Sequence, residues 1–460
     1  MNAGAAQRRR LRRLASHVVA PRPCSAATTT TAAAAAATKM LGGLRVVELA
    51  TVIAAPACAA LLADNGADVI KIENPRKPDF ARGWGLKDDP AKTADPGLRA
   101  APGGGGSAFV NLNRGKRSVA LDPTTPRGRA LLFQLLETAD IFVTNVRLRS
   151  LRRLGLDYES LHPQLPRLIY GQLSAWGRAG PMVDDPGYDF SSFWAHSGVQ
   201  DILRSSDTAP MPRFPGGVGD YTTGAQLYGG ILGALYHRER TGKGQLVDAA
   251  LLRAGVWFLS HAISMHAGGA EWTKNPSGLA TGGVRETTEL GDRRTAITNA
   301  CFKCRDGAWI QLMGLERDRH MPATLKALGL TLEGCGLGGG KGGANKDWAR
   351  ATRVVDAVMA GKTREEWGAV FDDHGVWWKG INRFEDMMGD VQANAAGCFV
   401  TVPGVSHKLI GSPVLLSAAD SAPVASAPGF GAHTVEVLKE LGCSESDVGQ
   451  LVEQGVVRCN

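Results

Sequence analysis

The chain has no unbroken run of eighteen or more strongly apolar residues, so the sequence predicts neither a membrane-spanning helix nor a membrane partner. Aromatic side chains are also sparse, at 6% of the 460 residues, while hydrophobic residues make up 44% and charged residues 21%. These proportions are those of an ordinary globular protein. A chain of this length is too long for one small core, so we expect two domains.

Acidic residues are absent from residues 1–40, which contain six arginines and one lysine. Those seven charges account for all but one unit of the formal net charge of +8. The remaining body is nearly neutral, so no nucleic-acid partner is expected. An arginine-rich, acid-free start followed by an Ala/Thr run at 26–38 is typical of an organellar transit peptide. We expect a mitochondrial address; a plastid address and a tail that directs nothing are the alternatives.

Paired cysteine motifs are nearly missing too. The eight cysteines are scattered, and a reducing matrix-type compartment favours thiols. Cys301 and Cys304 form a lone C-x-x-C pair with no second pair or histidine couple nearby. We therefore expect no metal site.

Short apolar runs alternate with helical stretches along the first half of the chain. We predict strands at 44–49, 69–73, 118–121, 141–144 and 168–173, and helices at 56–64, 126–138 and 158–161. Strands that alternate with helices predict an α/β fold with a doubly wound, mostly parallel sheet. A dinucleotide site would need G-x-G-x-x-G after the first strand, and residues 50–56 contain no glycine. Nicotinamide-dependent oxidoreduction is therefore disfavoured.

The second half predicts helices at 223–237 and 246–265, a second unit with short strands such as 308–312, and a helical end at 431–457 that packs back on the first unit. The expected organisation is a leader (1–40), a large Rossmann-like α/β domain (41–265), a smaller α+β domain (266–400) and a returning C-terminal segment (401–460).

Two carboxylates stand out, in Gly187-Tyr188-Asp189 and in Val218-Gly219-Asp220. A carboxylate behind a Pro-Gly turn can act as a covalent nucleophile. The same turn chemistry is also compatible with an aspartate that only caps the next helix. The residues near Asp189 leave both interpretations open.

From about residue 41 onward the chain resembles the family III CoA-transferases, which include formyl-CoA transferase, carnitine CoA-transferase and α-methylacyl-CoA racemase. The resemblance rests on LGGLRVVELATVIAAPACAALLADNGADVIKIE, VNLNRGKRSVALD, LRRLGLDYESL, the GYD segment, VGDYTTG, RERTGKGQLVDAALL, FKCRDG and GAHTVEVLKELG. It implies a two-domain subunit, an interlocked homodimer, and acyl-CoA and carboxylic acid substrates.

The resemblance also implies that Asp189 attacks the acyl-CoA thioester to give an aspartyl mixed anhydride, then an aspartyl-CoA thioester. An incoming carboxylate reverses these steps. Coenzyme A is then substrate, and no metal, ATP or resident cofactor is needed. Such a site must exclude water, and glycines near Gly282-Gly283 are candidates for a covering loop.

Racemase members carry a histidine before this aspartate, an aspartate in V-G-D and a later glutamate. This chain has Tyr188 and Lys303 at the first and last of these positions and keeps only Asp220. A phenol with a pKa near ~10 is a poor base at neutral pH. The transferase branch is therefore favoured, with a racemase or a catalytically silent CoA-binding protein as alternatives.

Residues expected to contact CoA by family position are Val52, Ile53, Arg76, Leu112, Lys116, Asn145, Val146, Arg147 and Arg153. The basic ones are suited to phosphates, although a solvated charged face is the alternative interpretation. Family arginines and a lysine are replaced here by Thr51, Asn74 and Ser174, which weakens the expected phosphate contacts. His196 and Arg213 are further candidates to orient the acceptor acid.

Overall fold

The computed structural model describes residues 39–84, 105–203, 210–212, 214–269, 297–338 and 347–459. Nearly all of the expected transit peptide, Arg213 and the glycines at 282–283 lie outside these ranges. Among the described residues, no helix has both the length and the apolarity needed to cross a membrane.

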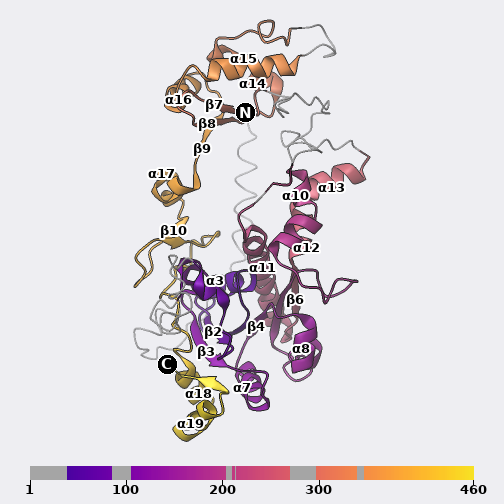
Figure 1. The fold of residues 1–460 in the computed structure, drawn as a ribbon, viewed down its shortest axis with the longest axis vertical. Coiled ribbons are helices and arrows are strands. Elements are labelled where there is room, and N and C mark those ends of the chain that lie inside the picture. The colour runs from indigo at the N-terminus through magenta and orange to yellow at the C-terminus, as the bar shows by residue number, and fades with distance from the viewer. Residues whose placement is uncertain are drawn as a thin grey trace, which may run out of the picture.

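A seven-stranded sheet organises the larger part of the protein (Figure 1). Its strand order is β12-β3-β2-β1-β4-β5-β6. The strands are β1 (Arg45–Leu49), β2 (Asp68–Glu73), β3 (Arg117–Leu121), β4 (Ile141–Thr144), β5 (Ile169–Ser174), β6 (Leu246–Ala250) and β12 (Val457–Arg458). Six are parallel, and β12 pairs antiparallel with β3. The predicted doubly wound sheet is confirmed.

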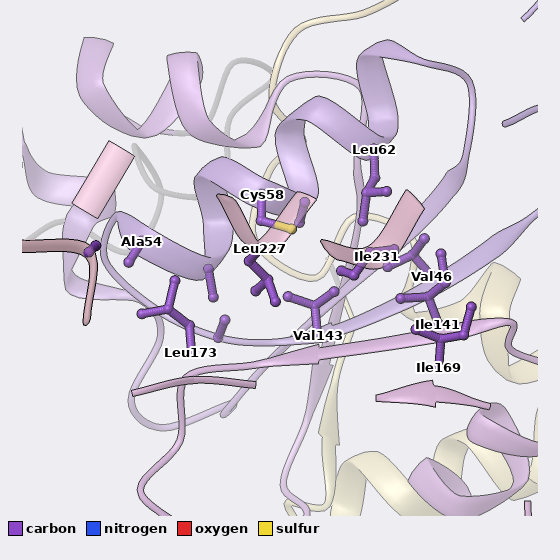
Figure 2. Packing of buried hydrophobic residues seen from close by; sticks show 14 of the residues in the cluster. Val46, Ala54, Cys58, Leu62, Ile141, Val143, Ile169, Leu173, Leu227 and Ile231 are labelled. Atoms are coloured by element: carbon purple, nitrogen blue, oxygen red, sulfur yellow. The ribbon is translucent and has the colours of Figure 1, made fainter. Parts of the chain in front are cut away.

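The sheet separates two apolar cores because successive residues in a strand face opposite sides. On one face, Val46 of β1 and Val143 of β4 pack under α3 (Ala54–Asp64) and α11 (Val218–Thr241), as Figure 2 shows. On the other face lie Val47 and Phe142. The helices of that face are α7 (Pro126–Glu137), α8 (Leu148–Leu154), α9 (Tyr158–Leu161), α18 (Thr434–Glu440) and α19 (Glu445–Glu453).

Two predictions about the following segment are wrong. Residues 246–265, predicted as one helix, begin with strand β6, followed by α12 (Leu251–Phe258) and α13 (Ser260–Ala267). The run LVDAA is too short for its period to distinguish strand from helix, and parallel pairing with β5 decides it. Helix α11 also begins at Val218 rather than Thr223, so Asp220 lies in its first turn.

A smaller α+β unit confirms the second part of the predicted fold class. It contains an antiparallel sheet of β7 (Cys301–Lys303), β8 (Trp309–Leu312) and β9 (Trp378–Ile381). Helices α14 (Arg317–Leu328), α15 (Trp348–Met359) and α16 (Arg364–Asp373) enclose a core that includes Phe302 and Phe371. Figure 1 shows this unit at one end of the molecule.

The chain returns from β9 to the large sheet through short elements. These are η4 (Phe384–Gly389), α17 (Val391–Ala395), β10 (Phe399–Val400) and β11 (Leu409–Ile410). Helices α18 and α19 then lead into β12 at the sheet edge. The last elements of the chain, α18, α19 and β12, therefore pack on the large sheet.

Candidate active site

Asp189 lies at the start of a short π-helix, η3 (Phe190–His196), and is only 3% exposed. Its side chain does not cap η3. Instead Oδ2 accepts a hydrogen bond from the backbone N–H of Gly217 at 2.8 Å and another from Trp194 Nε1 at 3.2 Å. Gly217 is the residue that precedes helix α11. The helix-cap interpretation of Asp189 is therefore wrong, because its carboxylate is held against a different helix.

The second oxygen of Asp189 is left without a hydrogen-bond partner. Oδ1 is buried and accepts no hydrogen bond from any described residue. Gly219 in the first turn of α11 lies against it, and a methyl group at position 219 would sit 2.2 Å from Oδ1. The absence of a side chain there allows α11 to pack closely on the carboxylate. One oxygen is thus fixed by N–H donors, while the other retains its lone pairs for chemistry.

A pocket of about 380 Å³ opens beside Asp189. It lies where β1, β4 and β5 end, and the strand order reverses between β1 and β4. Ligands of open α/β sheets bind in this crevice. The wall includes residues 51–54, 145–148 and 172–177, together with Phe80, Ser150, Val183, Asp185, Gly187, Tyr188, Asp220 and Leu251. Asp189 is not itself on this wall, but its chain neighbour Tyr188 is, and so is Asp220 from the first turn of α11, which packs against the Asp189 carboxylate.

Asp220 faces the pocket from α11. Burial, together with the nearby negative charge of Asp189, raises the pKa of Asp220 to about 7. A carboxyl group in this position therefore carries its proton for much of the time near neutral pH. Two acidic side chains can share this region because only one of them needs to be charged.

The turn from β1 to α3 forms another part of the pocket wall. Asn145 bridges it: the Thr51 N–H donates to Asn145 Oδ1 at 3.1 Å, and Asn145 Nδ2 donates to Thr51 O at 2.7 Å. Val52 has a φ of 72°, in the left-handed region. That conformation costs a residue with a branched Cβ roughly 1–2 kcal/mol, so the surrounding contacts must hold it.

Five of the nine expected CoA residues meet on the pocket wall: Val52, Ile53, Asn145, Val146 and Arg147. The other four do not. Arg76 and Arg153 are exposed away from the wall, and Leu112 is buried in the fold. Lys116 is also buried, with Nζ 2.7 Å from Glu48 Oε2. A phosphate contact by Lys116 is not supported, because its charge is already paired inside the protein.

Several residues of the site escaped prediction from the sequence. Trp176 and Phe80 lie on the wall, and Asp79 contacts Val52. The one available signal was Lys71, a charged residue between Ile70 and Ile72 in the middle of a strand, because a buried charge requires a partner. His196 is exposed, and its ring lies 5.3 Å from that of Trp176 in an edge-on contact. Lys303 lies on β7 of the small sheet and is not part of the wall.

Within the described ranges, no group of three or more His, Cys, Asp or Glu side chains is arranged to hold a metal ion. Cys301 and Cys304 both carry thiols on or beside β7.

Several proteins of known function or known structure are similar to this chain. An (R)-2-hydroxy-4-methylpentanoate CoA-transferase from Clostridioides difficile is 31% identical over 426 residues, covering 91% of this chain and all of the relative. A human α-methylacyl-CoA racemase is 28% identical over 428 residues, covering 91% of this chain and 98% of that protein. The crystal structure of a CAIB/BAIF family protein from Brucella suis superposes with a TM-score of 0.69 and 28% identity, covering 88% of this chain and all of that chain.

The match to a family extends over most of the sequence. Residues 41–434 match the family described as CoA-transferase family III. The protein belongs to CoA-transferase family III.

Proposed function

We propose that the protein transfers CoA from an acyl-CoA to a free carboxylic acid, with Asp189 as the covalent nucleophile. The observation that carries the proposal is the arrangement of the Asp189 carboxylate. Oδ2 is fixed by the Gly217 N–H and by Trp194, while the buried Oδ1 accepts no hydrogen bond from the residues that the structure describes. An aligned, dehydrated carboxylate oxygen is suited to attack a carbonyl carbon.

The reaction proceeds through two covalent intermediates. Asp189 Oδ1 attacks the thioester carbonyl, the carbon–sulfur bond breaks, and a mixed anhydride forms with release of CoA thiolate. The thiolate then attacks the aspartyl carbonyl, which releases the donor acid and leaves an aspartyl-CoA thioester. The acceptor carboxylate repeats the steps in reverse. The thioester bond energy is conserved throughout, so neither ATP nor a metal is required.

Water must be kept from both intermediates because each is readily hydrolysed. Asp189 is only 3% exposed, and the bulky side chains of Trp194 and Phe193 pack around it as part of the core. A protonated Asp220 on the wall adds no negative charge to a pocket that must admit a second carboxylate. These features favour acyl transfer between carboxylates over hydrolysis.

Racemisation is disfavoured by the groups that surround the pocket. A two-base racemase requires a base on each face of the α-carbon. Tyr188 takes the place of one base, and Lys303 lies in the small sheet rather than on the wall. Asp220 alone cannot serve both faces.

We further propose a mitochondrial homodimer. The arginine-rich, acid-free leader supports the address. Large apolar side chains that are exposed on the single chain, among them Trp257 and Phe258 of α12 and Phe384 of η4, support a second copy. Imaging of a C-terminal fluorescent fusion tests the address. Light scattering of the purified protein tests the dimer, and a monomeric mass would contradict it.

The decisive experiment is a CoA exchange assay. Purified protein without residues 1–40 is incubated with pooled acyl-CoAs and carboxylic acids, and the CoA esters are identified by mass spectrometry. New CoA esters are expected, and hydroxylamine should convert the activated Asp189 carbonyl of either intermediate into a hydroxamate, with release of the donor acid or of CoA. A broad acid panel that gives no new ester would contradict the transferase proposal, and proton exchange at the α-carbon without CoA transfer would favour a racemase.

A further inference from the structure

A buried ionic cluster lies beneath the turn that forms one wall of the pocket. Its members are Glu48 on β1, Lys71 on β2, Asp79 and Lys116, and all four side chains are fully buried. Lys71 Nζ lies 3.1 Å from both Glu48 Oε1 and Asp79 Oδ2. Lys116 Nζ lies 2.7 Å from Glu48 Oε2. Two cations therefore balance two anions inside the fold.

Such a cluster is not an efficient way to stabilise a core. Replacing buried ion pairs with apolar residues of similar volume is often neutral or stabilising, because desolvation offsets the attraction between the charges. The cluster is therefore better explained by the backbone groups that its members bind than by a contribution to the free energy of unfolding.

Three members of the cluster bind backbone groups of the turn between β1 and α3. Lys71 Nζ donates to Ala50 O at 2.8 Å. Both oxygens of Asp79 accept from the Val52 N–H at 3.2 Å. Lys116 Nζ donates to Pro56 O at 3.1 Å, in the first turn of α3. The cluster therefore fixes the turn at its beginning, middle and end.

The contact from Asp79 is to Val52, the residue of the turn with the least favourable backbone conformation. Val52 has a φ of 72° and a branched Cβ, and this combination is disfavoured without external restraint. Asp79 is itself well fixed: its Oδ1 accepts from the Ala81 N–H at 3.1 Å, and its own N–H donates to Glu73 Oε1 at 3.2 Å. A rigid acceptor thus faces the N–H of a strained residue on the pocket wall.

We propose that Asp79, anchored by Lys71, is a positioning residue that holds Val52 in its left-handed conformation and so sets the shape of the pocket wall. Asp79 does not line the pocket and acts only through Val52. The effect of Asp79 on the conformation of Val52 is inferred from the contacts above. Its effect on the reaction rate rests on the proposed CoA transfer.

The test is a double-mutant cycle of Asp79→Ala and Val52→Gly, because glycine adopts positive φ without a steric cost. Crystal structures and exchange kinetics are measured for all four proteins. With Val52 present, Asp79→Ala should move residue 52 out of the left-handed region and lower kcat by about 10–100-fold, as expected when a site is displaced by about 1 Å. In the Val52→Gly background, the same change should leave the turn in place and cost less than about fivefold.

A matched control separates positioning from the general loss of a buried charge. Asp64 at the far end of α3 forms a buried pair with Arg114, with Oδ2 2.6 Å from Nη2, and neither residue lines the pocket. Asp64→Asn should lower Tm but leave kcat within about threefold, because it breaks a buried pair without moving the turn.

The outcomes separate the two proposals. Retention of the left-handed Val52 in Asp79→Ala would overturn the positioning role whatever the activity. Equal losses of kcat in both backgrounds would overturn it as well. A wild-type protein with no CoA exchange would contradict the proposed function, and the crystal structures would still decide the role of Asp79. If Asp79→Ala does not fold, Lys71→Met with Asp79→Leu removes both charges, leaves the Glu48–Lys116 pair and undergoes the same measurements.

Discussion

Asp189 Oδ2 lies 2.8 Å from the backbone nitrogen of Gly217, the residue that precedes helix α11. This hydrogen bond links the two segments that carry the carboxylates of the site. It orients Asp189 and brings the first turn of α11, with Gly219 and Asp220, against it. The site therefore depends on the position of one helix start as much as on the aspartate itself.

Removing the Asp189 carboxylate should abolish exchange. For Asp189→Ala we expect kcat to fall by ~10⁴-fold or more, the scale seen when a covalent nucleophile is deleted. Hydroxylamine should no longer form a hydroxamate at position 189. The check is the exchange assay with mass spectrometry of the intact chain, and retention of full activity would remove Asp189 from its proposed role.

A methyl group at position 219 should disturb the nucleophile directly. Because a Cβ there would lie 2.2 Å from Asp189 Oδ1, Gly219→Ala should lower kcat by roughly 10–100-fold. Gly229→Ala is the matched control on the same helix, since no atom lies within 4 Å of its added Cβ. The control should stabilise the protein by about 0.4–1 kcal/mol and keep full activity. Equal losses in both variants would contradict the steric argument.

The indole N–H of Trp194 should contribute through orientation rather than packing. Trp194→Phe keeps an aromatic ring that can still stack on Phe214, where the ring centroids are now 4.0 Å apart. It removes the donor to Asp189 Oδ2. We expect kcat to fall by about tenfold, equivalent to ~1.4 kcal/mol, with little change in KM for the acyl-CoA. A raised KM at unchanged kcat would assign Trp194 to substrate binding instead.

Asp220 should give the activity a pH dependence near neutrality. Its pKa is about 7 in the folded protein, so it is uncharged below that pH and ionised above it. As pH rises through 7, the new charge should repel the acceptor carboxylate and raise KM for the acid. Asp220→Asn should remove this rise. An unchanged pH profile in the variant would show that another group causes it.

The same shift predicts how stability changes with pH. The folded pKa of Asp220 lies above its unfolded value of 3.8, so its favourable contribution is complete below about pH 4 and is lost as pH rises to 7. Asp220→Asn should therefore be more stable than the wild type at pH 8, by about 1–3 kcal/mol. The difference should vanish near pH 4. Urea denaturation at both pH values measures it.

Much of the fold could be predicted from the sequence because the information is local. The runs that form β1, β2, β4 and β5 are apolar and short, and helix stretches lie between them, so a parallel α/β sheet follows. The run at 246–250 was misassigned because LVDAA has no clear period, and its pairing with β5 supplied what the pattern lacked.

The candidate site was only partly predictable. The family positions predicted five residues that the structure places on one pocket wall: Val52, Ile53, Asn145, Val146 and Arg147. It also proposed Lys116 as a CoA contact, whereas the fold pairs that charge with Glu48, 68 positions earlier in the sequence. The sequence alone does not show whether a basic side chain contacts solvent, a ligand or a buried carboxylate.

The sequence by itself determined the alternation of strands and helices in the first half of the chain, the family, and an aspartate behind a Pro-Gly turn. Only the tertiary structure decided that this aspartate is dehydrated, that Gly217 and Trp194 hold it, and that Asp220 lies beside it on the pocket wall. The physical reason is that the shorter hydrogen bond and part of the burial at Asp189 come from Gly217 and the start of α11, a helix that begins 29 residues later. No local pattern encodes a contact between segments that the folded core brings together.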